Sequence, residues 1–205
     1  FATFYNMMYE QEVFGKDHYD WKRYQAAQSA LKASEADLLP IAHTQAGTVR
    51  YYPKGAVVLH MLRHLVGREN YNKAIRLYLQ RHAFANVDSD DLLNAFQDGL
   101  GLSLDYFWDQ WVYKGGEPHY EVSADLLGGS STNRVLVFTV KQTQAISPLN
   151  SVFDMPMRFE AHFEDGSKVQ TEARIHKTEQ SVRLELPDKK NLSYWLADPN
   201  RHILG

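Results

Sequence analysis

Two histidines of one predicted helix, His60 and His64, have a spacing that could bind a metal ion. Residues four apart share a face of a helix, so both imidazoles could reach one zinc ion. Zinc hydrolases with this spacing place a glutamate directly after the first histidine, where this chain has Met61. Arg63 lies beside the pair and disfavours a dication, and the other histidines have no partner at ligand spacing. The sequence therefore favours a solvated face or a satisfied surface pair, and predicts no metal site in this chain.

Other catalytic chemistries find little support. The chain has no cysteine, which excludes disulfides, thiolate metal ligands and a cysteine nucleophile. It also has no Gly-x-Ser-x-Gly turn, the motif that presents the nucleophilic serine of α/β-hydrolases. The glycines at 99–103 resemble a phosphate loop, but they lack the Lys-Ser/Thr ending and follow a predicted helix. The segment 128–132 is expected to be a flexible loop between strands. Asp90 and Asp91 are expected to serve as helix N-terminal charges.

Two adjacent tyrosines, Tyr51 and Tyr52, precede an apolar run in the stretch TVRYYPKGAVVLHML. A phenol at a loop-to-helix junction could aim its hydroxyl into a cleft and donate a hydrogen bond to a developing oxyanion. Tyrosine suits this role because its phenol is protonated at neutral pH and is a good donor. The alternative is that both rings pack and leave their hydroxyls at the surface. The local sequence by itself favours the packing alternative.

The elements that must position these side chains are helices over roughly the first 115 residues. Residues 41–53 have no period and are expected to be a loop, so the tyrosines stand at the start of a helix. Gly15 and Pro40 are expected helix stops, and Ser103 is an expected N-cap. Apolar residues recur at helical spacing in the segments 1–15, 17–40, 55–67, 69–84, 88–101 and 103–116.

After residue 116 the hydrophobic period changes from that of helices to that of strands. In one segment Met157, Phe159, Ala161 and Phe163 share a face, and Asp165-Gly166 supplies a hairpin turn. Strands are predicted at 134–142, 155–164, 168–177, 181–187 and 193–199. The chain is thus predicted to be an α+β multidomain protein. It has an all-α part at 1–116 and a small antiparallel β-sandwich at 117–205.

The composition of this 205-residue chain limits the kinds of partner that it could bind. The chain is 44% hydrophobic and has a formal net charge of −3. No block of Lys and Arg stands out, which argues against nucleic acid as a partner. No apolar run approaches the length of a membrane span. The opening FATFYNMMYE has no signal-peptide pattern, lacks an initiator methionine and begins inside a helical pattern. We therefore expect the chain to be a piece of a longer protein.

Several motifs in order, over some seventy residues from Tyr52 to Val122, resemble the M1 family of zinc metallo-aminopeptidases. The β part resembles, more loosely, the sandwich domain that follows in that family. The motifs are Tyr52-Pro53-Lys54-Gly55-Ala56, Val66-Gly67-Arg68-Glu69-Asn70-Tyr71, Tyr78 to His82, Asp90-Asp91-Leu92, and Trp111 with Gly116-Glu117-Pro118.

The resemblance implies that residues 1–116 are the C-terminal, helical half of a thermolysin-like catalytic domain. Its third zinc ligand would lie in an Asn-Glu-Gly-Phe-Ala motif whose Phe is Phe1, so a Glu is expected two residues upstream. The His-Glu-x-x-His pair and the Gly-x-Met-Glu-Asn substrate strand would also lie upstream. Zinc is therefore implied as cofactor of the parent protein, a peptide as its substrate, and no cofactor or metal ligand within this chain.

Only Tyr52 carries over as a catalytic residue, as the phenol that stabilises the tetrahedral oxyanion; Tyr51 is expected to pack. The family usually has a polar residue after that tyrosine, and Pro53 stands there here. Proline is tolerated in the first turn of a helix, so the geometry is expected to be retained. The rival hypothesis is a non-catalytic relative that acts as a scaffold or peptide-binding module. A third, carbohydrate binding by the β part, rests only on fold analogy.

Overall fold

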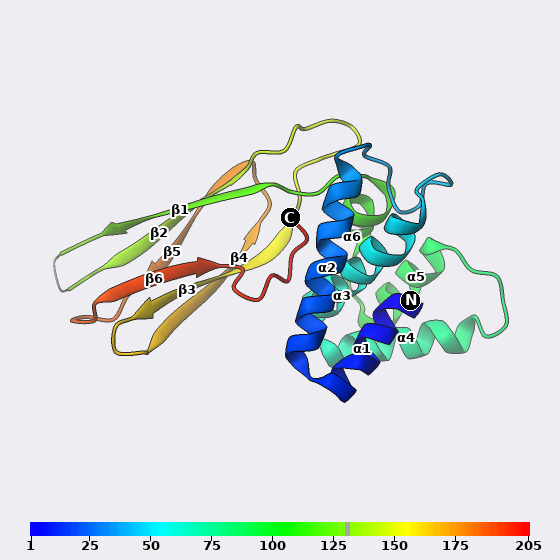
Figure 1. The fold of residues 1–205 in the computed structure, drawn as a ribbon, viewed down its shortest axis with the longest axis horizontal. Coiled ribbons are helices and arrows are strands. Elements are labelled where there is room, and N and C mark those ends of the chain that lie inside the picture. The colour runs from blue at the N-terminus through cyan, green and yellow to red at the C-terminus, as the bar shows by residue number, and fades with distance from the viewer. Residues whose placement is uncertain (130–131) are drawn as a thin grey trace. The chain divides into compact units, whose positions relative to one another are not determined.

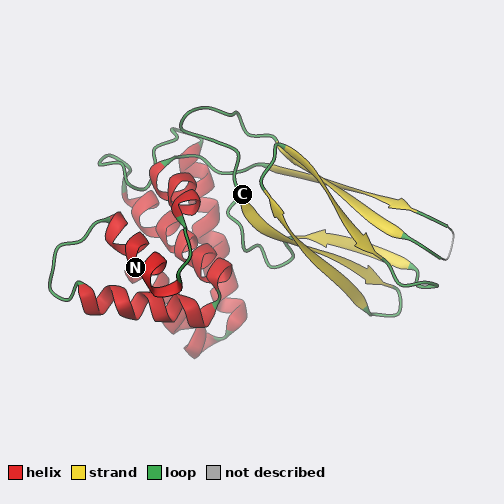
Figure 2. Cartoon of the chain, turned by 180° about the vertical axis from the view of Figure 1, so that it is seen from behind, coloured by secondary structure: helices red, strands yellow, loops and turns green. Residues whose placement is uncertain are grey.

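The chain forms two compact units in a computed structural model that describes residues 1–129 and 132–205 (Figure 1). The first unit carries the helices and the second carries the strands (Figure 2), which confirms the α+β class. Ser130 and Ser131, in the loop expected at 128–132, lie outside the described residues. The first unit comprises Phe1–Glu117, Ile146–Ser151 and Leu204, and the second comprises Pro118–Ala145, Val152–Ile203 and Gly205.

The helical unit follows the predicted order of segments, with differences at some of the helix ends. α2 ends at Ser34, before Pro40, and the N-cap position of α6 is Leu104 instead of Ser103. The Ser103 hydroxyl donates to the Asp105 carboxylate at 2.5 Å. The helices are α1 (Ala2–Phe14), α2 (Lys16–Ser34), α3 (Gly55–Val66), α4 (Arg68–Arg81), α5 (Ser89–Leu100) and α6 (Asp105–Trp108), with π-helical turns η1 (Arg50–Lys54) and η2 (Asp109–Tyr113).

Aromatic rings join three of these helices in the core of the unit. The Tyr71 ring of α4 meets Phe4 of α1 edge-on at 5.9 Å and Phe96 of α5 edge-on at 5.6 Å. All three side chains are at most 1% exposed. Edge-to-face contacts of this kind stabilise beyond the area that they bury. The core therefore holds α1, α4 and α5 together.

The N-terminus of α5 is closed by a capping box. The Asp88 carboxylate accepts from the backbone N–H groups of Asp90 and Asp91, and the Asp91 carboxylate accepts from the N–H of Asp88. This confirms the helix start expected at these acidic residues.

Replacing Asp88 by alanine should lower the free energy of unfolding of the helical unit by about 0.5–2 kcal/mol, because two backbone donors lose their acceptor. Asp88→Ser retains a capping oxygen and should lose much less. Urea denaturation of the two variants measures the difference. Equal losses in both variants would contradict the capping role.

The β unit consists of two three-stranded antiparallel sheets with the orders β1-β2-β5 and β4-β3-β6. Five strands lie close to the predicted segments, whereas β1 was not predicted. None of the residues of β1 is buried, although Tyr120, Val122 and Ala124 are half-buried and alternate with exposed polar residues. The strands are β1 (Tyr120–Leu127), β2 (Val135–Gln142), β3 (Met155–Phe163), β4 (Lys168–Ile175), β5 (Glu179–Glu185) and β6 (Leu192–Ala197).

The inner faces of the two sheets meet through aromatic rings. Met157, Phe159, Ala161 and Phe163 are all at most 4% exposed, which confirms their predicted common face. The Phe159 ring of β3 lies 4.7 Å from the Phe138 ring of β2, in the other sheet. The core of this unit is therefore shared by both sheets.

The opposite face of β3 carries a buried carboxylate, Glu160, which is 3% exposed. Its oxygens lie 2.8 Å from Lys168 Nζ and 2.8 Å from His162 Nε2. Burial opposes ionisation of Glu160, but these two partners outweigh burial and lower the pKa of the carboxyl. The native fold thus favours the ionised form.

Glu160→Gln should destabilise the β unit at pH 7 by about 1–3 kcal/mol, because charge-assisted hydrogen bonds are lost. The pKa of Glu160 is lower in the folded state than in the unfolded state, so its contribution is present above about pH 4.5. That contribution disappears as the pH falls through the folded pKa. Unfolding curves of both proteins from pH 7 to pH 3 should therefore converge toward the acid end. A difference that is constant with pH would contradict the ionised assignment.

Candidate active site

The tyrosine pair lies within a helical segment that begins earlier than predicted. The N–H of Tyr51 donates to the carbonyl of Gly47 at 3.2 Å, and the chain is helical from Thr48 onward. The turn η1 then leads directly into α3, with the N–H of Gly55 bonded to the carbonyl of Arg50. The loop expected at 41–53 therefore ends at residue 47. The tyrosines stand in the second turn of a helix rather than in front of it.

Pro53 explains why this turn is π-helical. Inside an α-helix a proline has no N–H for the carbonyl four residues back, here Val49, and its ring collides with that carbonyl. A π turn bonds residues five apart and so avoids that contact; such turns occur frequently at functional sites. The expectation that Pro53 occupies the first turn was wrong, and the wider turn is how the chain accommodates it.

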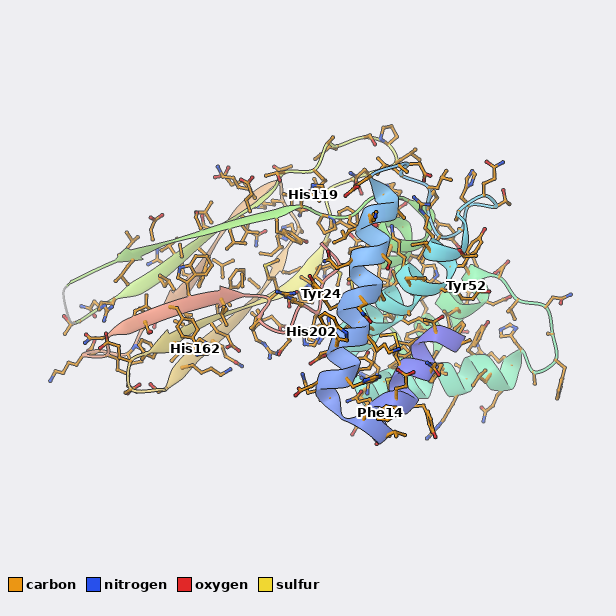
Figure 3. All side chains as sticks on the ribbon, in the orientation of Figure 1. Phe14, Tyr24, Tyr52, His119, His162 and His202 are labelled. Carbon is orange, nitrogen blue, oxygen red and sulfur yellow. The ribbon has the colours of Figure 1, made fainter. Side chains whose placement is uncertain are left out.

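The two tyrosines differ in what their hydroxyls contact. Tyr51 is 43% exposed, and its hydroxyl donates to the carbonyls of His43 at 3.0 Å and Thr44 at 3.1 Å. Tyr52, which is labelled in Figure 3, is 55% exposed, and none of the described residues bonds to its hydroxyl. The Tyr51 proton is thus engaged by the chain itself, whereas the Tyr52 proton can be donated to a bound molecule.

Two buried cations hold the inner side of the same turn, and sequence reasoning missed both of them as site residues. Arg50 donates to the carbonyls of Ala46, Ala33 and Asp37 at 2.9–3.1 Å. Lys54, which is 1% exposed, lies 2.7 Å from the Glu117 carboxylate. The partner of Lys54 is far away in the sequence, so no local pattern could pair them.

An apolar cavity of about 360 Å³ opens beside the turn. Tyr51 and Gly55 line it together with side chains of α3, α4 and η2, such as Leu59, Tyr78 and Val112. Gly55 itself is not required for close packing, because a Cβ there would meet only the Arg50 carbonyl at 3.6 Å. The volume is within the range of small-ligand sites.

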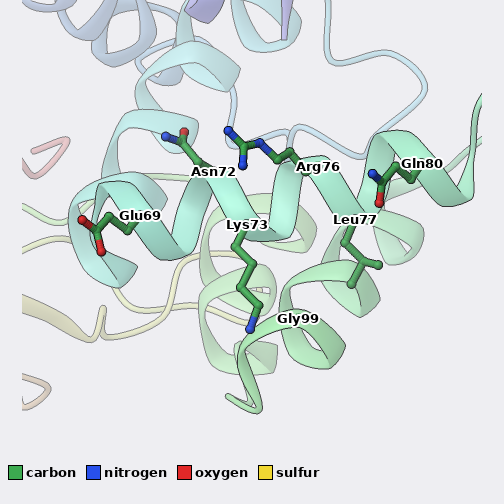
Figure 4. A pocket seen from close by; sticks show the side chains of 7 residues that line it. All are labelled: Glu69, Asn72, Lys73, Arg76, Leu77, Gln80 and Gly99. Carbon is green, nitrogen blue, oxygen red and sulfur yellow. The ribbon is translucent and has the colours of Figure 1, made fainter.

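A second hollow, of about 480 Å³, lies along α4 near Gly99 of α5 (Figure 4). It is lined by charged and polar side chains, among them Glu69, Lys73 and Arg76. None of the tyrosines of the candidate site contributes to it. This hollow is therefore separate from the turn that carries Tyr52.

The described residues do not fit a metal site. His60 is only 6% exposed, and its Nδ1 lies 2.7 Å from the Tyr19 hydroxyl. Burial raises the pKa of Tyr19 to about 12, so the phenol stays protonated and shares a hydrogen bond with the imidazole nitrogen. The solvated alternative is thus wrong for His60. Among residues 1–129 and 132–205, no group of three or more His, Cys, Asp or Glu side chains could hold a metal ion.

No helix in the described part of the chain combines the length and hydrophobicity that crossing a membrane requires.

Comparisons with known proteins agree on one family. The profile of the Peptidase family M1 domain matches residues 1–111. The "Probable aminopeptidase 1" of Saccharolobus solfataricus is 29% identical over 139 residues, which cover 66% of this chain and 17% of that protein. Aminopeptidase N of Escherichia coli is 35% identical over 78 residues, covering 38% of this chain and 9% of that protein.

The fold of the chain is similar to that of a solved aminopeptidase. Legionella pneumophila aminopeptidase A, solved in complex with aspartic acid, aligns with a TM-score of 0.65 at 15% identity. The alignment covers 89% of this chain and 20% of that one. The chain thus spans less than a fifth of the length of the curated relatives described above. Because the family profile matches more than half of its residues, the chain belongs to peptidase family M1.

Proposed function

We propose that this chain is part of a zinc-dependent aminopeptidase that removes N-terminal residues from peptides. The observation that carries the proposal is the placement of Tyr52. Its phenol is exposed on a π turn, and its hydroxyl has no partner among the described residues. The resemblance to the family motif supports the same tyrosine. Two of the similar proteins are named as aminopeptidases, which supports the reaction class.

Tyr52 acts as a hydrogen-bond donor in this proposal. Attack on a peptide carbonyl places negative charge on its oxygen, and a donor held in advance at that point lowers the barrier. The helical turn supplies the rigidity, because Arg50 and Lys54 fix its inner side. The donor is therefore ready before the charge develops.

The zinc of the reaction has no ligand set in the described residues. The resemblance places its ligands N-terminal to Phe1. In the parent gene, a Glu two residues before Phe1 and a His-Glu-x-x-His motif eighteen residues further upstream are expected. A parent without that motif would leave the scaffold hypothesis as the better account.

The isolated 205-residue chain should bind no stoichiometric zinc and cleave no peptide. After dialysis against excess zinc and then buffer, elemental analysis should find far less than one zinc per chain. One tightly bound zinc per chain would contradict the proposal that all zinc ligands lie N-terminal to Phe1.

The full-length protein distinguishes the enzyme from a non-catalytic peptide-binding module. An enzyme should hold stoichiometric zinc and release the first residue from aminoacyl chromogenic substrates. A full-length protein that binds peptides without turnover would refute the enzymatic proposal.

A further inference from the structure

Tyr52 lies midway between two buried cations of one helical turn. The side chains of Arg50 and Lys54 are 7% and 1% exposed, and residues four apart on a helix share a face. Tyr52 is two residues from each of them and therefore lies on the opposite, exposed side. The contacts of the two cations thus determine how the turn is rotated, and with it the direction of the phenol.

Lys54 is the more deeply buried of the two cations. Its Nζ lies 2.7 Å from Glu117 Oε1 and donates to the carbonyl of Gly116 at 3.1 Å. The Glu117 side chain is only 2% exposed and also accepts from the Ser34 hydroxyl at 3.0 Å. One ion pair therefore joins the turn η1, the end of α2 and the segment that leaves the helical unit.

The segment that carries Glu117 is itself closely held. A Cβ at Gly115 would lie 1.6 Å from the carbonyl oxygen of Leu38, and one at Gly116 would lie 2.4 Å from the Asn150 side chain. Gly116 also has a φ of +73°, which glycine adopts most readily. Glu117 therefore presents its carboxylate from a fixed backbone, and Lys54 is bound to a rigid partner.

Stability alone does not account for an ion pair at this place. Well-packed apolar side chains of similar volume stabilise a core as well as a buried ion pair does, and often better. An ion pair with two hydrogen-bonded neighbours, the Gly116 carbonyl and the Ser34 hydroxyl, differs in that its contacts are directional and so limit how the turn can rotate. Displacement of a catalytic group by 1 Å is enough to reduce a rate strongly.

We propose that Lys54 and Glu117 are positioning residues for Tyr52, whose ion pair fixes the π turn so that the phenol stands where the oxyanion forms. This inference rests on the proposed function. Neither residue touches the substrate; both act through Tyr52.

The test uses the full-length enzyme and three single variants, Lys54→Met, Glu117→Gln and Tyr52→Phe, together with Lys54→Met/Tyr52→Phe. Leu93→Ala is the matched control, because Leu93 is 7% exposed in the core of α5 and is not among the residues of the turn. Melting temperature, kcat and KM are measured for each variant, with kinetics well below the lowest melting temperature.

Lys54→Met should lower kcat at least about tenfold with KM changed less than about twofold, because the donor is misplaced rather than lost. Glu117→Gln keeps an acceptor for Lys54 and Ser34, so its kcat should fall less than that of Lys54→Met. Leu93→Ala should lower the melting temperature while kcat stays at the wild-type value. In the Tyr52→Phe background, Lys54→Met should have little further effect, since the group it positions is gone.

A wild-type kcat in both Lys54→Met and Glu117→Gln would overturn the inference. It would also be overturned if Lys54→Met lowered kcat as much in the Tyr52→Phe background as in the wild-type enzyme. If Lys54→Met does not fold, Glu117→Gln decides, since it preserves the shape of the site. Unchanged kcat in Tyr52→Phe would refute the proposed function as well. A loss in Tyr52→Phe without any loss in the Lys54 and Glu117 variants refutes the positioning role alone.

Discussion

Tyr52→Phe in the full-length enzyme should lower kcat by about 10²–10³-fold, the usual effect of removing one donor from an oxyanion site. KM should change little, because the hydroxyl interacts with charge that develops only in the transition state. The fold should be unaffected, since the side chain is 55% exposed and its hydroxyl bonds to none of the described residues. Steady-state kinetics with an aminoacyl chromogenic substrate measures the effect.

Tyr51→Phe is the matched control for that experiment. It removes the same atom one residue away, but the Tyr51 hydroxyl bonds to carbonyls of the chain itself. Its kcat should remain within a few-fold of the wild-type value. A larger loss in Tyr51→Phe than in Tyr52→Phe would mean that the roles of the two phenols are reversed.

Phe159→Ala should cost the β unit about 3–5 kcal/mol in free energy of unfolding. The ring is fully buried and lies 4.7 Å from Phe138 of the other sheet, so its removal leaves a cavity between both sheets. Native-state hydrogen exchange of the slowest amides of β2 and β3 measures the loss within this unit, separately from the helices.

Leu126→Ala is the control for the core truncation, because Leu126 is 48% exposed on β1. It should change the free energy of unfolding by no more than about 0.5 kcal/mol. If the hydrogen-exchange protection of the β2 amides were unchanged in Phe159→Ala, the stability of one sheet would not depend on packing against the other.

Periodicity was sufficient to predict the elements that bury a stripe of side chains. The apolar alternation of β3 and the capping aspartates of α5 are local signals, and the structure has both. Strand β1 was missed although Tyr120, Val122 and Ala124 alternate with polar residues, and the early helix start at Thr48 was missed because apolar spacing is absent there.

The candidate site was predicted only in part for a similar reason. Tyr52 was singled out through its family motif. Lys54 was identified only as part of that motif, and the structure shows that it is bound to Glu117 inside the unit. His60, taken for a surface residue, is buried against Tyr19. Contacts between segments far apart in the sequence decide these roles, and such contacts leave no mark on local spacing.

Inhibition by a phosphinic peptide, which imitates the tetrahedral intermediate, tests most directly whether Tyr52 donates to the oxyanion. Full-length wild-type enzyme and Tyr52→Phe are compared for this inhibitor and for a substrate-like peptide amide. If Tyr52 donates in the transition state, Tyr52→Phe should weaken phosphinate binding by about the same factor as it lowers kcat/KM, with little change in binding of the amide. Equal phosphinate affinity in both proteins would contradict the role of Tyr52 on which this account depends.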